Sequence, residues 1–424
     1  MTEKPKTTDN AEQPANPVNA TVRIVGTAVV AVLLGWMMLK SYLFKPQMYK
    51  ASFKPELYKV SGQTTGMDMT ELYKISGLTM GTEFYVVVCA DSNWGWERTL
   101  VAIENELARI NQMMSTYIDD SEIMQFNDNH STDWIEVSPE MVKLVKLSKE
   151  TSEIVDGKFD ITIGPLVDLW GFGKKRRTLA IPPPHADIVK TREYCGLDKL
   201  EYREESPGMK PALRKAVSEL RIDLSGVAKG YGVDCVADLL EKRGYTNYLV
   251  EIGGETRTKG RKVVLLEQKG ILSTFSSDQQ SVPWQVGIKQ PIPLEQFELP
   301  IIELKVNLND HAMATSGDAY NTREIGGRRY THIIDPKTGE AVMPEEFGTD
   351  IDGEELGSVS VIADTCAEAD ALATGFYLLG VKRGIATANA HDLAVVYLIR
   401  TGYLDNPIRV VMSEAFKKNY EQTQ

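Results

Sequence analysis

The feature that most constrains this chain is an uncharged apolar run at residues 24–39, bracketed by Arg23 and Lys40. The run is slightly shorter than the roughly 20 residues that a membrane-spanning helix needs. The flanking bases can snorkel to the lipid headgroups, and Trp36 and Tyr42 suit the membrane interface. A cleaved signal peptide is the alternative, but no small-x-small cleavage site follows the run. We therefore expect one uncleaved transmembrane helix ahead of a separate body.

The composition along the chain predicts four parts. These are a disordered tail at 1–22, the transmembrane anchor at 23–44, a spacer at 45–77 and a globular body at 78–424. The spacer holds a short repeat, in which ELYKVSG at 56–62 recurs as ELYKISG at 71–77. Two copies are too few for a solenoid, so we expect a duplicated strand or a spacer between membrane and body. Lysines on both sides of the apolar run leave the orientation open by charge alone.

The overall charge narrows the class of partner. The chain has 424 residues, of which 42% are hydrophobic and 25% charged, and a formal net charge of −12. This composition is typical of a globular protein, and its acidity argues against a surface that neutralises nucleic-acid phosphates. We expect a small-molecule or protein substrate and no nucleic-acid partner. The four cysteines are scattered without a C-x-x-C pair, which predicts free thiols rather than a zinc site or disulfides.

Helical and strand patterns mix irregularly after about Tyr73, which predicts an α+β fold rather than a repeating βαβ series. Strands are expected where β-branched and aromatic residues cluster, at 83–89, 221–224 and 248–252. Helices are expected at 100–114, 139–157, 225–244 and 367–379. Two segments without a clear period, 261–282 and 345–355, are expected to be surface insertions.

The strongest local motif is DLSGVAKGYGVD at 223–234. It joins a strand end, a Ser-Gly turn and a helix N-terminus, where free N–H groups and the helix dipole suit a phosphate. Gly230 and Gly232 fall inside the helix, where each costs on the order of 1 kcal/mol relative to alanine. A ligand or another backbone is therefore expected nearby, with Lys229 reaching a phosphate; equally, the glycines could serve only helix packing, with Lys229 in solvent. The motif matches neither a P-loop nor a Rossmann fingerprint.

A second motif, EADALAT at 368–374, places Asp370 and Thr374 four residues apart and so on one helix face. Carboxylate and hydroxyl oxygens are ligands that Mg²⁺ prefers, with phosphate oxygens completing the shell. A polar stripe on an exposed helix, with Thr374 bonded back to its own turn, is the commoner explanation of such a spacing.

Three further segments are candidates for a site. The segment YTHIIDPKTG at 330–339 places His332 at the head of a short strand, where it could be a general base or a structural hydrogen-bonding residue. The hydroxyl-rich segment TSGD at 315–318 could bind phosphate or only turn the chain. LWGFG at 169–173 and Tyr117 offer aromatic surfaces for a flat ring, although core packing is the usual role of such residues.

Taken together, these segments resemble the ApbE-type FAD:protein FMN transferases over the body from about Met80 onward. The matching segments follow the order of that family: LTMGT at 78–82, MSTY at 114–117, FDITIGP at 159–165, LWGFG at 169–173, IDLSGVAKG at 222–230, EIGG at 251–254, WQVGI at 284–288, TSGD at 315–318, YTHIIDP at 330–336, SVSVI at 358–362 and EADALAT at 368–374. Residues before Met80 lie outside the resemblance, and an apolar segment stands where many relatives carry a lipid-anchor cysteine.

The resemblance implies an α+β fold related to the tunnelling fold, with the nucleotide in a cleft between two lobes. The implied FAD-binding residues are Met80, Tyr117, Lys158, Phe159, Asp160, Asp223, Lys229 and Ile333. The implied Mg²⁺ ligands are the Gly226 carbonyl, Asp370 and Thr374. His332 would assist deprotonation of the acceptor hydroxyl.

The implied activity is Mg²⁺-dependent transfer of FMN from FAD onto a threonine or serine hydroxyl of an acceptor protein, with release of AMP. The implied partners are FAD and an acceptor flavoprotein subunit of a membrane redox complex. The anchor would hold the enzyme in the inner membrane with its body on the extracytoplasmic side. An FAD pyrophosphatase that gives FMN and AMP, and a non-catalytic FAD-binding assembly protein, are the alternatives. The presence of Asp370 and Thr374 favours an enzyme over a binding protein.

Overall fold

The computed structural model describes residues 70–91, 95–174, 177–265, 279–291, 301–318, 322–344, 353–403 and 407–421. All of them lie in one compact unit, Ala51–Gln424. The expected tail, the expected anchor and the first copy of the repeat lie outside the described residues. Within the part of the chain that is described, no helix is both long and apolar enough to cross a membrane.

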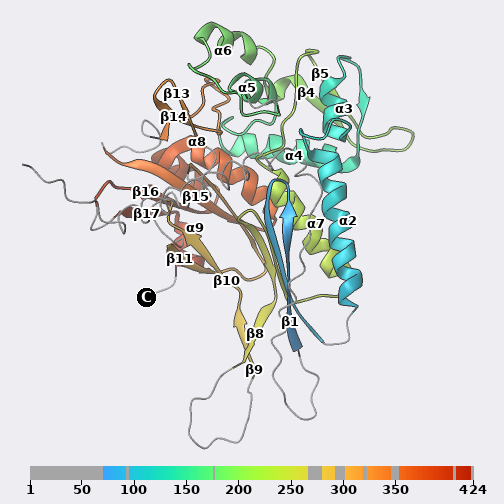
Figure 1. Cartoon of the computed structure of the whole chain (residues 1–424), viewed down its shortest axis with the longest axis vertical. Coiled ribbons are helices and arrows are strands. Elements are labelled where there is room, and N and C mark those ends of the chain that lie inside the picture. The colour runs from blue at the N-terminus through green and yellow to red at the C-terminus, as the bar shows by residue number, and fades with distance from the viewer. Residues whose placement is uncertain are drawn as a thin grey trace, which may run out of the picture. The chain divides into compact units, whose positions relative to one another are not determined.

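An antiparallel eight-stranded sheet forms the centre of this unit (Figure 1). Its strands, in spatial order, are β1 (Thr70–Thr79), β2 (Thr82–Asp91), β6 (Tyr248–Ile252), β7 (Glu255–Lys259), β12 (Ala312–Gly317), β15 (Glu355–Ala363), β16 (Ala394–Arg400) and β17 (Ile408–Met412). The second copy of the repeat lies within β1, so that copy is a strand.

Three helices cover one face of this sheet: α2 (Trp96–Met114), α7 (Ala228–Lys242) and α8 (Cys366–Ala390). Helix α7 packs on β6 and β7, α8 packs on β12 and β15, and α2 packs on α7. Because side chains alternate across a strand, Phe84, Val86 and Val88 all point to this face, and each is at most 1% exposed. Helix α8 is broken at Gly380, whose φ of 72° leaves the helical region.

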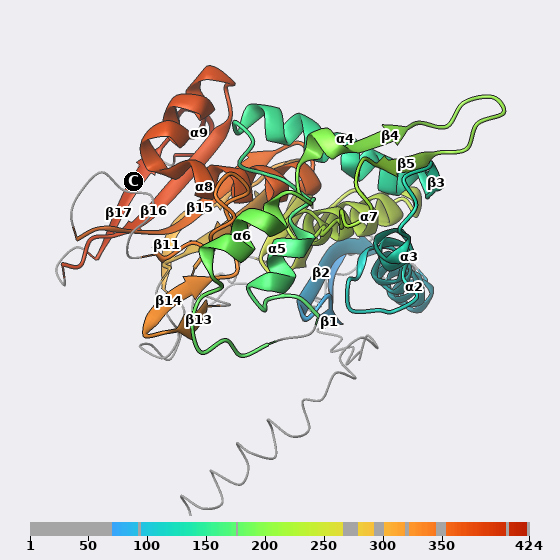
Figure 2. The same ribbon diagram turned by 90° about the horizontal axis from the view of Figure 1, so that it is seen from above.

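A second group of elements packs beyond the ends of α7 and α8. It contains α3 (Glu122–Asp128), α4 (Pro139–Ile154) and a small sheet of β3 (Ile135–Glu136), β4 (Leu200–Arg203) and β5 (Ala212–Lys215). Beside them lie α5 (Gly164–Leu169), α6 (His185–Arg192), the 3₁₀ turn η1 (Leu197–Lys199), β13 (Thr322–Ile325) and β14 (Arg328–Thr331). Figures 1 and 2 show α5 and α6 next to β13 and β14, and a shared apolar cluster that includes Trp170 and Tyr330 explains this contact.

The other face of the main sheet is covered unevenly. Hairpin β10 (Gln285–Lys289) and β11 (Ile302–Asn307), together with α9 (Glu414–Tyr420), buries an apolar cluster against β12, β15 and β16. Toward β1, β2 and β6, this face instead opens into a cavity of about 890 Å³, whose lining includes Lys74, Tyr85 and Glu251. Hairpin β8 (Arg261–Leu265) and β9 (Gln279–Pro283) lies at the edge of that cavity.

Most of the expected elements are present, and one expectation is wrong. The expected strand at 221–224 is an extended segment with one isolated bridge, between Arg221 and Ile163. Instead of a neighbouring strand, the side-chain amide of Asn127 accepts from Ile222 N at 2.7 Å and donates to Ile222 O at 2.8 Å. The expected insertion at 261–282 contains β8 and β9, which pair with each other and not with the main sheet.

Candidate functional site

Helices α7 and α8 cap each other. The first turn of a helix leaves backbone N–H groups without a helical partner. Asp370 of α8 accepts from the N–H of Gly230 at 2.9 Å, while Asp234 of α7 accepts from the N–H groups of Cys366 at 3.0 Å and Ala367 at 2.9 Å. Arg257 of β7 donates to Asp234 at 2.8 Å. The two helix N-termini are therefore held together by carboxylates rather than by apolar contact alone.

Gly230 is required by this arrangement. A Cβ at this position would lie 2.2 Å from the carbonyl oxygen of Cys366, and backbone cannot move away as a flexible side chain can. Gly232 similarly lies against Met80, with an ideal Cβ 2.8 Å from the Met80 methyl group. Within α7, therefore, the two glycines admit close contacts from other parts of the chain. This explains why residues of low helix propensity occupy the first two turns of α7.

A cluster of three charged side chains lies where α7, α8 and β7 meet. The Lys229 ammonium is 2.8 Å from Oε1 of Glu255 and 3.7 Å from Oδ1 of Asp370. Both carboxylates are buried, whereas the Lys229 side chain is 30% exposed. Oε2 of Glu255 has no hydrogen-bond partner in the described structure. The interpretation of Asp370 as part of an exposed polar stripe is thus wrong, as is that of Lys229 as a solvated side chain.

Burial and charge act in opposite directions on these groups. Burial lowers the pKa of Lys229, but the carboxylates of Asp370 and Glu255 outweigh it and raise that pKa above its ordinary value. Burial raises the pKa of Glu255 well above its ordinary value, and the nearby ammonium of Lys229 offsets this only in part. When all three groups are ionised, the cluster carries one more negative than positive charge. It is therefore suited to a cation or to a ligand that brings one.

Glu255 reaches this place because of a two-residue hairpin turn. Ile252 and Glu255 are directly paired across β6 and β7, with Gly253 and Gly254 between them. Both glycines have positive φ, 65° and 108°, as the tight turns of two-residue hairpins demand. A paired residue shares its face with its partner, so Glu255 points with the buried Ile252 toward α7. The turn also packs on the stem of Lys229, with the Gly253 Cβ position 3.3 Å from its Cδ.

The predicted metal ligands lie beside this cluster. The Thr374 hydroxyl is 3.2 Å from Ser316 Oγ of β12 and 3.4 Å from the Cβ position of Gly226. It also donates to the Asp370 carbonyl at 3.4 Å, one turn back in its own helix. No group of three or more His, Cys, Asp or Glu side chains suited to a metal occurs among the described residues. The donors fit a hard cation such as Mg²⁺, which keeps several waters and uses phosphate oxygens instead of an all-protein cage.

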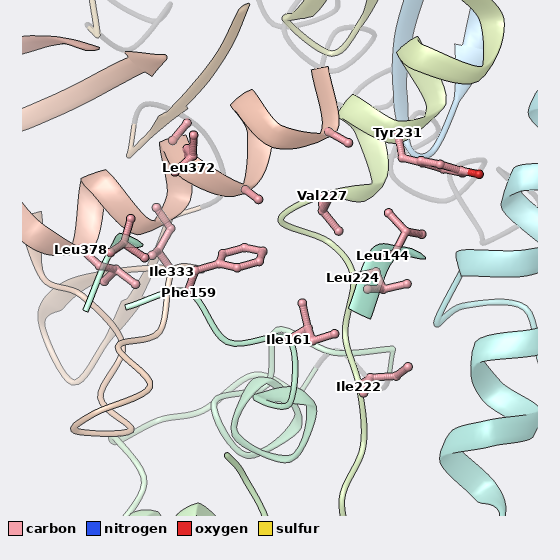
Figure 3. Packing of buried hydrophobic residues seen from close by; sticks show 14 of the residues in the cluster. Leu144, Phe159, Ile161, Ile222, Leu224, Val227, Tyr231, Ile333, Leu372 and Leu378 are labelled. Carbon is pink, nitrogen blue, oxygen red and sulfur yellow. The ribbon is translucent and has the colours of Figure 1, made fainter. Parts of the chain in front are cut away.

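The predicted flavin-binding residues come from several elements. Met80 has a φ of 50° in the turn between β1 and β2 and contacts Gly232. Phe159 lies beneath Gly226, 3.0 Å from its Cβ position. Figure 3 shows Phe159 beside Ile333, and both belong to the largest apolar cluster. Met80, Phe159 and Ile333 are thus held by packing close to the turn that precedes α7.

The polar members of the predicted FAD set contact other groups of the protein. Lys158 pairs with Asp335 at 2.5 Å. Asp160 accepts from the N–H and the hydroxyl of Thr162, and burial raises its pKa despite these bonds. Asp223 accepts from Ser225 N at 2.8 Å and so shapes the turn before α7. Tyr117 is half-buried, two residues past the Ser115 that ends α2.

Two sequence interpretations need correction. His332 lies in an exposed bend directly after β14, and not at the head of a strand, because β14 ends at Thr331 and residues 333–342 fold back on it. Trp170, proposed as a stacking surface, is 1% exposed and packs on Tyr330 with ring centroids 5.2 Å apart. Its indole N–H donates to Gly339 O at 2.9 Å, so Trp170 belongs to the core.

Another buried charged cluster lies directly after the C-terminal end of β12, in the TSGD segment. Arg400 of β16 donates to both carboxylate oxygens of Asp318, at 2.7 and 2.6 Å, and to Glu355 at 3.1 Å. Arg329 donates to Glu355 at 3.2 Å and is 3.6 Å from Asp318. Two cations and two carboxylates balance each other. The segment is thus fixed by ion pairs where it leaves the sheet.

Three of these residues escaped the sequence analysis: Glu255, Asp234 and Arg400. The sequence does contain a pattern that identifies Glu255, because this residue directly follows the EIGG segment at 251–254. An acidic residue immediately after a Gly-Gly hairpin turn has a defined face, and that face could have been inferred from the buried alternation of β6. For Asp234 and Arg400 no local signal exists, since their partners lie far away in the sequence.

Comparison with known proteins assigns the chain to a class. The model of the ApbE family matches residues 80–397, and the chain belongs to that family.

Particular relatives agree with this assignment. FAD:protein FMN transferase from Haemophilus influenzae is 35% identical over 323 residues, 76% of this chain and 83% of the relative. The Vibrio cholerae enzyme of the same name is 36% identical over 315 residues, 74% of this chain and 82% of the relative. Among solved structures, the flavin transferase ApbE from Vibrio cholerae matches with a TM-score of 0.66 and 33% identity, over 83% of this chain and all of that chain. The apo flavinyl transferase ApbE of Pseudomonas stutzeri gives a TM-score of 0.67 at 28% identity, over 85% of this chain and all of that chain.

Proposed function

We propose that this chain moves the FMN half of FAD onto a threonine or serine hydroxyl of an acceptor protein, in a reaction that requires Mg²⁺. FMN transfer from FAD to a protein is the activity named for its relatives, which it matches over most of their length. The observation that supports the proposal most directly is the buried cluster of Lys229, Glu255 and Asp370 at the N-terminus of α7. The Lys229 ammonium suits a pyrophosphate, and the Asp370 carboxylate beside it suits the accompanying metal.

Each part of the site has a share in this chemistry. Lys229 binds the pyrophosphate, and Asp223 orients the nucleotide half. Met80, Tyr117, residues 158–160 and Ile333 hold the flavin. Asp370, Thr374 and the Gly226 carbonyl would hold Mg²⁺, which neutralises charge on the phosphate oxygens during the transfer. Phosphoryl transfer depends chiefly on such positioning and neutralisation.

The bond changes follow from the substrates. The acceptor hydroxyl oxygen attacks the phosphorus on the flavin side of the pyrophosphate, and the bond from that phosphorus to the bridging oxygen breaks. AMP leaves with the electron pair, and the hydroxyl proton passes to a base. His332 is our candidate for that base, since its exposed position after β14 leaves it accessible to a protein acceptor. The product is FMN joined to the acceptor through a phosphoester.

The direct test is to incubate the detergent-solubilised protein with FAD, Mg²⁺ and candidate acceptor subunits, and to weigh the products. The proposal expects an acceptor heavier by one FMN unit and an equal amount of AMP. Chelation of Mg²⁺ should stop both. FMN and AMP formed at the same rate without an acceptor would instead identify an FAD pyrophosphatase. Flavin binding without any turnover would identify a non-catalytic assembly protein.

For its place in the cell, we propose an inner-membrane anchor at 23–44 with the body on the extracytoplasmic side. The apolar run at 24–39 supports this. Full-length protein should sediment with membranes and need detergent for release. Recovery of the uncleaved protein in the soluble fraction would contradict the anchor. Protease added to intact spheroplasts should degrade the body if it faces outward.

A further inference from the structure

Glu255 has no role in the reaction as proposed so far, although it is the closest partner of Lys229. Its side chain is 3% exposed, and one carboxylate oxygen accepts from the Lys229 ammonium at 2.8 Å. The other oxygen is buried with no partner. A buried carboxylate that is only half satisfied costs free energy. Glu255 therefore calls for a functional explanation.

Asp370 is the second carboxylate near Lys229 and competes with Glu255 for its ammonium. One oxygen of Asp370, Oδ2, is already bonded to the N–H of Gly230 at 2.9 Å. The remaining oxygen, Oδ1, is 3.7 Å from the Lys229 ammonium, beyond hydrogen-bond distance. Oδ1 is thus the oxygen that Asp370 can offer to a metal. An ammonium that moved about 1 Å closer would occupy it, because charge-assisted bonds of this kind form at roughly 2.8 Å.

We infer that Glu255 is a positioning residue, which holds the Lys229 ammonium away from Asp370 and thereby keeps Oδ1 of Asp370 open to Mg²⁺. The inference rests on the proposed metal site at Asp370 and Thr374. Glu255 does this from a fixed position, since the two-glycine turn sets its face and the same turn packs on the stem of Lys229. It acts through Lys229 and does not itself bind the metal or the flavin.

The experiment is a double-mutant cycle read out by metal binding in the absence of flavin. Mn²⁺ serves as the probe, and its affinity for the detergent-solubilised full chain is measured by electron paramagnetic resonance. Glu255→Gln keeps the shape and one acceptor oxygen but loses the charge. It should weaken Mn²⁺ binding about tenfold, since the loss of one charge-assisted bond frees Lys229 to pair with Asp370. In transfer assays, the same variant should need about tenfold more Mg²⁺ and approach the wild-type rate at saturation.

The second arm removes the competitor. In a Lys229→Met background, Glu255→Gln should change the Mn²⁺ affinity by no more than about twofold, because little coupling remains once the shared partner is gone. An equal effect in both backgrounds would overturn the inference, since it would mean that Glu255 attracts the metal directly by its charge. An unchanged Mn²⁺ affinity in Glu255→Gln alone would overturn it as well.

Matched variants guard against trivial outcomes. Glu251→Gln alters another half-buried carboxyl of the same hairpin, on the opposite face of the sheet, and should leave Mn²⁺ affinity unchanged. Glu255→Asp keeps the charge, so it should bind Mn²⁺ more tightly than Glu255→Gln if charge holds Lys229. Wild-type protein that binds Mn²⁺ but transfers no FMN would count against the proposed function alone. Wild-type transfer with a Glu255→Gln variant of wild-type Mn²⁺ affinity would count against this inference alone.

Discussion

Two of the charged clusters in the described part of the chain, those around Asp318 and Asp370, differ in how completely they are paired. Around Asp318, two arginines meet two carboxylates, and the aspartate accepts bonds on both oxygens from Arg400. Around Asp370, one lysine meets two carboxylates, and a carboxylate oxygen of Glu255 is left without a partner. Each cluster contains at least one carboxylate that is almost fully buried. The clusters differ in their balance of charge.

This difference in pairing distinguishes a cluster that stabilises the fold from one that is suited to bind a ligand. A buried ion pair stabilises a fold only when its hydrogen bonds are complete, because the cost of removing charge from water is large. The Asp318 cluster meets this condition and needs nothing more. The Asp370 cluster does not, and its surplus negative charge suits a cation. The comparison therefore predicts that substitutions at the two clusters affect different quantities.

The largest effect is expected at Asp370. Asp370→Asn can still accept from the N–H of Gly230 but loses the charge, so the protein should stay folded while FMN transfer falls at least about 1000-fold, given the several kcal/mol that a bound metal contributes. Asp370→Ala should abolish transfer and also lose the cap. Transfer rates against Mg²⁺ concentration, with thermal melting as the folding control, provide the measurement. An Asp370→Asn enzyme with normal Mg²⁺ dependence would end the metal-site proposal.

The opposite pattern is expected at Arg400. Arg400→Met leaves Asp318 buried without its main partner, which should cost about 3 kcal/mol of unfolding free energy. Transfer per folded molecule should stay within about twofold, since no group of this cluster contacts the metal site. Urea denaturation and an active-fraction assay measure the two quantities. Arg383→Met is the control, because its pair with Asp156 is exposed on both sides and its loss should change the unfolding free energy far less.

Lys215 is a buried cation outside both clusters. Lys215 is fully buried, its ammonium faces the carbonyls of Leu220 and Asn127, and burial lowers its pKa from 10.5 to about 8, aided by Arg221 and opposed by Asp128 and Glu219. Because the folded pKa is depressed, the unfolded chain binds the extra proton between these values. Stability should thus rise with pH from about 8 to 10.5 and be lost as pH falls through about 8.

The measurement is the unfolding free energy across that pH window. Wild type should gain at most about 1.4 kcal/mol per pH unit from this one group. Lys215→Met should lack that part of the slope, whereas the exposed Lys146→Met should keep it. Identical profiles for wild type and Lys215→Met would show that this lysine is charged in the folded protein across the whole range.

The smallest effect is expected at Thr374. Its hydroxyl would be a neutral ligand at the proposed metal site, so Thr374→Ala should lower transfer by about tenfold, and excess Mg²⁺ should restore part of it. Thr374→Ser keeps the hydroxyl and should remain close to wild type. Equal activity of the alanine and serine variants at low Mg²⁺ would remove Thr374 from the ligand set. The hydroxyl would then serve only its bonds to Ser316 and to its own helix turn.

The sequence predicted the parts of the site that are local. DLSGVAKGYGVD and EADALAT each lie around one helix, so their spacing alone showed which residues share a face. The contacts that join the two helices could not be predicted this way, because Asp234 meets Cys366 from 132 residues away and Asp370 meets Gly230 from 140. The antiparallel order of the main sheet was likewise beyond a pattern of single strands.

The misplaced strand at 221–224 has a similar cause. Its alternation of apolar and polar residues is typical of a strand, but the hydrogen bonds of Ile222 go to the side chain of Asn127. The Asn127 amide takes the place of a neighbouring strand, and the residues at 221–224 do not reveal this substitution. Glu255 was missed for the opposite reason. The face on which Glu255 lies could be predicted from the sequence. Its contact with Lys229, and the nearness of Asp370, could not.

The two-residue length of the turn between β6 and β7 determines which face of the sheet the side chains of β7 occupy. Glu255, Arg257 and Lys259 alternate along β7, and all three bond to partners on α7. Adding a single residue at Gly253–Gly254 would rotate the strand by half a period and turn every one of these side chains toward the cavity on the other face. Homologous chains should therefore tolerate loops of any length between β8 and β9, while the spacing between Ile252 and Glu255 stays invariant. Counting residues at this hairpin would distinguish a competent enzyme from a relative that has kept only the fold.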